Sequence, residues 1–186
     1  MRGREAVWFV ALMALLASCS TPAPDLPSPS TSPTSARYGA PVVDAPRDVT
    51  AYAGQPCTLL SGSELQALGL RGPGVQRTSV DVQECSWPTA ERGRLAMAVN
   101  ADRDLLVDTY RSRVLPIFVP TTVEGMPAVR QRSRPDDNTC TVTTGLGPRQ
   151  ALETEWSGLT SRQTTDPCAR AEEAIALVVR KLPPQR

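Results

Sequence analysis

The residues of this chain best suited to chemistry are its five cysteines, and the first of them has a context of its own. Cys19 follows an apolar run, residues 6–16, that is preceded by Arg2 and Arg4. A charged start, an apolar stretch and small residues form the order of a secretory signal. The run is shorter than the ~20 apolar residues that a membrane-spanning helix needs. We therefore expect a cleaved signal and no membrane span.

The segment Leu-Ala-Ser-Cys that ends at Cys19 resembles the lipobox of bacterial lipoproteins. In such proteins the cysteine sulfur receives a diacylglyceryl group, and cleavage leaves that cysteine as the first residue. Two acyl chains hold a protein on a membrane stably, whereas one chain does so only marginally. We expect a signal peptide at 1–18, lipidation at Cys19, and a location on the extracytoplasmic face of the cell membrane.

The other four cysteines are Cys57, Cys85, Cys140 and Cys168. An exported domain meets an oxidising setting, and four thiols permit three pairings. A zinc site is the competing interpretation, but the four lack a close C-x-x-C pair. Cys85 and Cys140 fall on expected strands, while Cys57 and Cys168 each follow a proline at a helix start. We predict the disulfides Cys85–Cys140 and Cys57–Cys168, and no metal.

No set of residues typical of an enzyme is found. Histidine, the commonest general base and metal ligand, is absent from the sequence. Asp136 and Asp137 follow Pro135, where aspartate is expected in a turn for backbone reasons. Glu172 and Glu173 fall in the first turns of an expected helix, where negative charge suits the helix dipole. We therefore predict no catalytic residue and no cofactor.

Three arginines at a spacing of two, Arg130, Arg132 and Arg134, would leave one face of a strand together. They could bind an anion or an acidic partner. Alternatively, Glu153 and Glu155 on a later strand neutralise them across the sheet, which is the interpretation that we favour. If a binding surface exists, its first candidates are these arginines, Met126 in the loop at 125–127, and the turn at 133–138, because loops on a rigid scaffold commonly carry recognition.

The charge of the mature chain gives no reason to expect a nucleic acid as partner. Removing 1–18 takes away Arg2, Arg4 and Glu5 and leaves 18 basic and 18 acidic residues. A net charge near zero provides no electrostatic attraction to nucleic acid or to anionic lipid.

The pattern of apolar residues predicts an α+β domain in the order α-β-β-α-β-β-β-α. The expected helices are 61–70, 104–114 and 166–182, and the expected strands are 80–87, 94–101, 121–132, 139–144 and 151–157. These elements predict an antiparallel sheet of about five strands, covered by helices mainly on one side. Trp87 and Trp156 fall on strands and are expected to fill the core or its rim.

Cap residues and apolar stripes support the three helices. Ser63 with Gln66 predicts the start of the first helix, and Asp166 followed by Pro167 predicts the start of the last. The stripes are Leu106, Tyr110 and Val114 on the second helix and Ala171, Ile175, Val178 and Leu182 on the third. On the second expected strand, Leu95, Met97 and Val99 share one face.

The segment 20–55 is rich in Pro, Ser, Thr and Ala and has few large apolar residues. Such a segment buries too little surface to offset its chain entropy. We therefore predict three parts: the signal at 1–18, a lipidated cysteine with a disordered stalk at 19–55, and a single domain at 56–186.

An ordered set of short motifs runs through the chain. They are Pro56-Cys57 ahead of Leu59-Leu60, Cys85 with Trp87, Gly125 with Pro127-Ala128, and Asp166-Pro167-Cys168. With these motifs, residues 47–184 resemble the actinobacterial lipoprotein family known as domain of unknown function 3558. The resemblance implies an exported, lipid-anchored domain of the cell envelope with no established activity.

We expect a non-catalytic, monomeric module that is held on the membrane through Cys19 and binds an unknown envelope protein or small molecule. One alternative is an envelope hydrolase that uses a carboxylate or a serine without histidine. The other is a structural or sensor lipoprotein. Carboxylates that converge in one cleft would favour the hydrolase, whereas an apolar groove or a flat patch would favour the binding module.

Overall fold

The computed structural model describes residues 37–79, 82–90, 92–158 and 165–186. Cys19, the expected signal and the first part of the expected stalk lie outside these residues.

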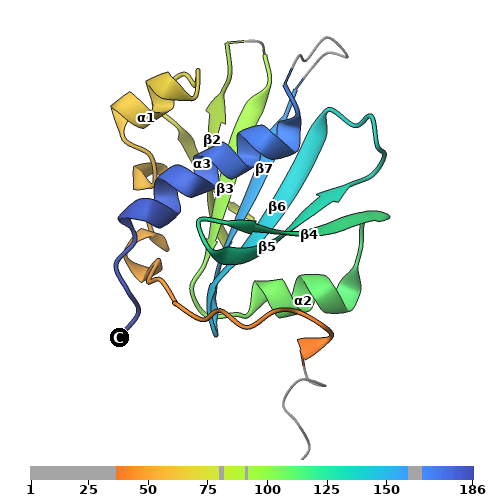
Figure 1. Ribbon diagram of the computed structural model, residues 1–186. Helices are drawn as coiled ribbons and strands as arrows, with labels where there is room; N and C mark the ends of the chain where they lie inside the picture. The colour runs from red at the N-terminus through yellow and green to blue at the C-terminus, as the bar shows by residue number, and fades with distance from the viewer. Residues whose placement is uncertain (1–36, 80–81, 91, 159–164) are drawn as a thin grey trace, which may run out of the picture. The chain divides into compact units, whose positions relative to one another are not determined.

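A single antiparallel sheet of seven strands organises the described part of the chain (Figure 1). The strands are β1 (Val75–Ser79), β2 (Val82–Pro88), β3 (Arg94–Asn100), β4 (Ile117–Val123), β5 (Met126–Arg132), β6 (Thr139–Gly147) and β7 (Gln150–Ser157). Their order across the sheet is β1-β2-β3-β7-β6-β5-β4. The predicted α+β class is confirmed.

The sheet has two more strands than expected. The segment 121–132 is not one strand, because Glu124 (φ 50°) and Gly125 (φ 77°) turn the chain between β4 and β5. Pro120 is tolerated because β4 is an edge strand. The other extra strand, β1, consists mostly of exposed polar residues, so it lacks the alternation that marks a half-buried strand.

The helix α3 (Pro167–Lys181) covers one face of the sheet, which we call the core face (Figure 1). The predicted cap is confirmed, since the side chain of Asp166 accepts a hydrogen bond from Cys168 N at 3.2 Å, with Pro167 first in the helix. The predicted stripe on α3 is buried, as are Leu95, Met97 and Val99 on β3. Trp87 and Trp156 are also buried there, as expected.

The helix α1 (Gly62–Ala67) has its cap two residues earlier than predicted. Ser61, not Ser63, caps it, because the Ser61 side chain accepts from Glu64 N while Glu64 Oε2 accepts from Ser61 N at 2.6 Å. This reciprocal pair satisfies two backbone donors at once. Two short 3-10 helices, η2 (Thr50–Tyr52) and η3 (Pro56–Thr58), precede α1.

The helix α2 (Leu105–Ser112) packs on the opposite face, where Leu106 and Tyr110 are buried against Val129. The helix ends when Arg113 adopts a left-handed conformation (φ 41°). Val114, predicted to continue the apolar stripe, is therefore 78% exposed.

The four predicted cysteines do form two disulfides, but the predicted pairing is wrong. The bonds are Cys57–Cys85 and Cys140–Cys168. In each bond, one cysteine follows a proline at the start of a helix, η3 or α3. The other cysteine belongs to a strand, β2 or β6, and its side chain lies on the core face of the sheet. The expected strand-to-strand bond cannot form because β3 and β7 separate β2 from β6.

The packed domain begins well before residue 56, so the predicted boundary is a second correction. Ala40 is buried beside α2, and Val49 is completely buried in the core under α3. Arg47 N donates to Leu146 O at 2.7 Å, and Gln185 N donates to Pro46 O at 2.9 Å. The 3-10 helix η2 is short, and most of the segment is held by such partners and not by a long strand or helix of its own, which is why composition alone did not reveal it.

Candidate binding cleft

The predicted arginine surface on β5 is not assembled. Arg130 binds Glu172 on α3, and Arg132 binds Asp166 and donates to Pro135 O at 3.1 Å. Arg134 lies 3.7 Å from Asp136 in the exposed turn. Glu153 and Glu155 cannot neutralise Arg130 and Arg132, because the register places the two sets on opposite faces of the sheet.

Met126 is not available to a partner either. Its side chain is only 3% exposed and belongs to the core under α3. The adjacent turn residues Glu124 and Gly125 carry the chain reversal instead.

The face opposite α3, which we call the open face, is covered by α2 only over part of its width. In the register, Glu84 on β2, Ala98 on β3 and Glu153 on β7 form one row across it. Ser86, Ala96, Glu155, Thr141 and Gln131 form the next row. Because Ala96 and Ala98 are small, β3 forms a low floor between the longer side chains of β2 and β7.

Three cavities meet on this floor. The largest, about 520 Å³, lies between α2 and the sheet and is lined by residues that include Leu105, Gln131 and Glu153. The second cavity, of about 150 Å³, has Asn100 and Glu84 among its lining residues. The third, of about 80 Å³, has Arg94 and Glu155 among its lining residues. Glu153 lines all three. We call these three adjoining cavities together the Glu153 cleft.

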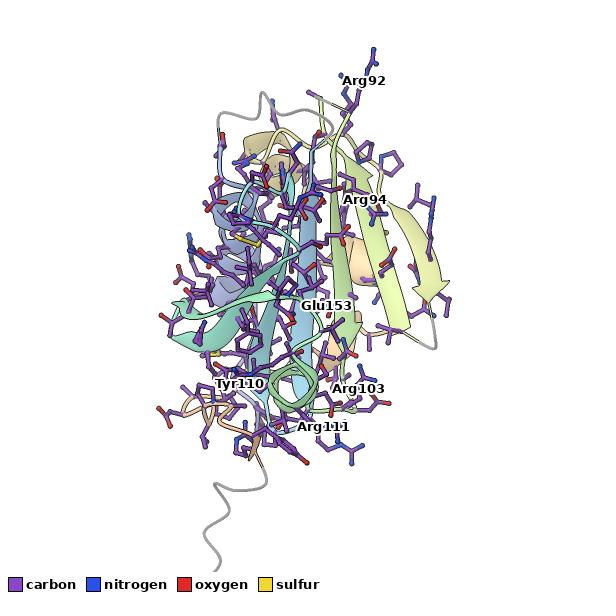
Figure 2. The ribbon with its side chains drawn as sticks, turned by 90° about the vertical axis from the view of Figure 1, so that its right-hand side faces the viewer. Arg92, Arg94, Arg103, Tyr110, Arg111 and Glu153 are labelled. Atoms are coloured by element: carbon purple, nitrogen blue, oxygen red, sulfur yellow. A yellow bond between two sulfur atoms is a disulfide. The ribbon has the colours of Figure 1, made fainter. Side chains whose placement is uncertain are left out.

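Figure 2 looks onto the open face and shows Glu153 between Arg94 and Arg103, with α2 seen end-on beside it. Burial raises the pKa of the Glu153 carboxyl above its ordinary value, and the nearby charges of Glu155 and Glu84 add to the increase. Arg103 opposes it. Within the described residues, Glu153 has no hydrogen bond or ion pair of its own.

The neighbouring charges are held in ion pairs. Arg94 Nη2 lies 2.6 Å from Glu155 Oε1, and this contact raises the pKa of Arg94. Asp108 on α2 binds both Arg111 at 2.7 Å and Arg103 at 3.4 Å. These pairs fix the walls of the cleft around the unpaired carboxylate.

Two amide side chains complete the cleft. Gln131 is 8% exposed and lines the largest cavity, and Asn100 is 5% exposed and lines the second. Among the described residues, neither amide takes part in a hydrogen bond. Their amide atoms are not among the buried polar atoms that lack a partner, so they stay accessible from the cavities that they line.

The sequence indicates some of the residues that line this cleft. The alternation in "ALETEWS" shows that Glu153 and Glu155 share a polar face, but their neighbours could not be named without the strand order. Gln131 lies between two of the predicted arginines and faces the other side of the sheet, so the arginine spacing gives no sign of its role.

Over residues 14–181 the chain matches the family described as "Protein of unknown function (DUF3558)". The chain belongs to this family. No curated protein and no solved structure matches it. The predicted family is thus confirmed at the level of DUF3558, and this member carries the Glu153 cleft on the face that α3 leaves free.

No membrane-spanning helix occurs in the described residues of this DUF3558 member, since none combines enough length with enough apolar character. The same part of the chain contains no group of three or more Cys, Asp or Glu side chains arranged to hold a metal ion.

Proposed function

We propose that this DUF3558 protein is anchored by lipid at Cys19 to the extracytoplasmic face of the cell membrane and binds a ligand in the Glu153 cleft without transforming it. The observation that carries the binding role is the unpaired carboxylate of Glu153 at the meeting point of three cavities. A partly buried charge without a partner destabilises a fold, so its presence in a cleft favours a function. The total space is in the range of small-molecule sites.

The anchor rests on the lipobox-like segment before Cys19. Mass spectrometry of the mature protein should find Cys19 at the amino terminus with its acyl chains. The Cys19→Ala form should appear in the soluble exported fraction or as an uncleaved precursor. An unmodified terminus at another residue in the wild-type protein would contradict the anchor.

A second candidate is a hydrolase, because Glu153 and Glu155 converge in the cleft. Residues two apart on a strand lie ~6.8 Å from each other, which is near the separation of paired carboxyl groups in glycoside hydrolases. A carboxyl group with a raised pKa beside a second carboxylate is also the pattern of an acid and its partner.

Two features favour binding over hydrolysis. Both carboxylates rise from the same strand face, so they approach a ligand from one side, whereas hydrolysis of a glycoside requires groups that flank the bond. In addition, Arg94 already binds Glu155 at 2.6 Å. Turnover of a glycan or ester substrate that is abolished by Glu153→Gln would overturn this preference.

The binding role is tested by filling the cleft. Ala98 lines the two smaller cavities and Thr141 lines the largest, so both positions are changed together. The full chain is purified from its own cells as the wild type, as the double variant Ala98→Leu/Thr141→Leu, and as the control Ala67→Leu, whose position is exposed on α1. Native mass spectrometry should then detect a small molecule bound to the wild type and the control but not to the double variant. Equal retention by all three proteins would place the ligand elsewhere and refute the role of the cleft.

A further inference from the structure

We infer that the ligand of the Glu153 cleft is a neutral polyhydroxylated molecule of one or two sugar rings, an inference that rests on the binding role proposed above. It draws on four properties of the cleft: its hydrogen-bonding groups, its charge balance, its apolar wall and its size.

The hydrogen-bonding groups on the floor are of mixed character. The amides of Gln131 and Asn100 each present donors and an acceptor, and an ionised Glu153 only accepts. A hydroxyl group both donates and accepts, so adjacent hydroxyls of a sugar satisfy amides and carboxylate together. An ammonium group, as in a polyamine, only donates hydrogen bonds and would leave the amide NH₂ groups without an acceptor.

The two amides are the second observation that points to a ligand. With 8% and 5% exposure, Gln131 and Asn100 are more than nine-tenths buried, and each lines a cavity. Neither has a hydrogen-bond partner within the described residues, and their amide atoms are not among the buried polar atoms that lack a partner, so they remain open to the cavities. A bound polar molecule can take the place of the water on these amides.

The charges around the cleft are nearly balanced. The four carboxylates that line it are Glu84, Asp108, Glu153 and Glu155, and the three guanidinium groups are Arg94, Arg103 and Arg111. Arg77 lies opposite Glu84 in the register and offsets the remaining charge. The raised pKa of Glu153 reduces any excess of negative charge further. A neutral ligand fits this balance better than an anion or a polycation.

The wall of the largest cavity is aliphatic on one side, where it includes Leu105, Val114 and Leu115. Val114 is 78% exposed, so its side chain is accessible to a ligand at the rim of this cavity. The C–H face of a sugar ring would cover such a wall. No aromatic side chain lines the three cavities in the described part of the chain, so the cleft has no stacking partner for a nucleobase or another flat ring.

The probes for the test are neutral di- and trisaccharides of glucose, galactose, mannose, arabinose and N-acetylglucosamine. Spermidine and inorganic phosphate represent the charged ligand classes. Binding to the full-length protein, in a detergent without a sugar headgroup, is measured by saturation-transfer NMR and then by titration.

We expect at least one saccharide to bind, and Gln131→Leu and Asn100→Leu each to weaken it roughly tenfold. Gln66→Leu, at an exposed position of α1, is the matched control and should bind as the wild type does. Neither amide has a hydrogen-bond partner within the described residues, so the melting temperatures of both cleft variants should change little.

The alternative results separate this inference from the binding role. Binding of spermidine or phosphate alone, lost in Ala98→Leu/Thr141→Leu, would overturn the sugar class and leave the cleft as the binding site. Failure of every saccharide to bind would also overturn the sugar class. Saccharide binding that this double variant leaves unchanged would overturn both the ligand class and the role of the cleft.

Discussion

Arg130 and Glu172 form an ion pair with two parallel hydrogen bonds, in which Nε donates to Oε1 and Nη2 donates to Oε2, each at 2.5 Å. The pair joins β5 to α3, and its two residues are 42 positions apart in sequence. The contact raises the pKa of Arg130. The first arginine of the predicted binding stripe therefore stabilises the fold.

A double-mutant cycle should measure this role. Arg130→Gln and Glu172→Gln, singly and together, should reveal a coupling of about 1–2 kcal/mol in urea unfolding, because the pair is bidentate and partly buried. The control cycle uses Arg134 and Asp136, which are 3.7 Å apart and largely exposed, and should show no measurable coupling. Equal coupling in both cycles would contradict this assignment.

Peptide mapping without reduction should recover Cys57 joined to Cys85 and Cys140 joined to Cys168. Both bonds close loops with a sequence separation of 28. In the loop-entropy description, replacing either pair by alanine should lower the free energy of unfolding by about 3–4 kcal/mol. Recovery of a peptide linking Cys57 to Cys168 would show that the structure has the wrong connectivity.

Glu153→Gln should raise the melting temperature at pH 7. The folded-state pKa of Glu153 is raised above its ordinary value of 4.5 by burial and by Glu155 and Glu84, with Arg103 opposing. The folded state therefore holds this proton more tightly than the unfolded state, and wild-type stability falls as the pH rises from about 4.5 through the folded-state pKa.

The gain in stability of Glu153→Gln over the wild type should therefore be largest above the folded-state pKa of Glu153 and should vanish below pH 4.5. The matched variant Glu155→Gln loses the ion pair with Arg94 and should be less stable than the wild type, by about 0.2–1 kcal/mol. A fall in melting temperature for Glu153→Gln at pH 7 would mean that its carboxylate has a stabilising partner.

The segment before residue 56 should contribute measurably to stability. Val49→Ala removes a fully buried side chain from the core and should cost about 2 kcal/mol in urea unfolding. Val42→Ala, at a position that is 65% exposed, should change stability by less than about 0.5 kcal/mol. Equal losses of stability in the two variants would indicate that the packed domain begins at residue 56.

The local features of the fold were largely predictable. The pairing of Asp166 with Pro167 marked the start of α3, and the alternation of Leu95, Met97 and Val99 marked a half-buried strand. Such signals depend on residues within one or two turns of each other, and the physics that produces them is local. The two errors in strand count come from β1, which has no apolar face, and from the short turn at Glu124 and Gly125.

The sequence alone determined the family, the α+β class, and the four cysteines that form disulfides. Only the tertiary structure decided which cysteines pair, because pairing depends on which helix start lies over which strand. It also decided that Arg130 contacts α3 while Gln131 lines a cleft. The cleft combines Ala98, Gln131 and Glu153 from strands that are distant along the chain. Its composition follows from strand order and register, which long-range packing sets and local residue patterns do not encode.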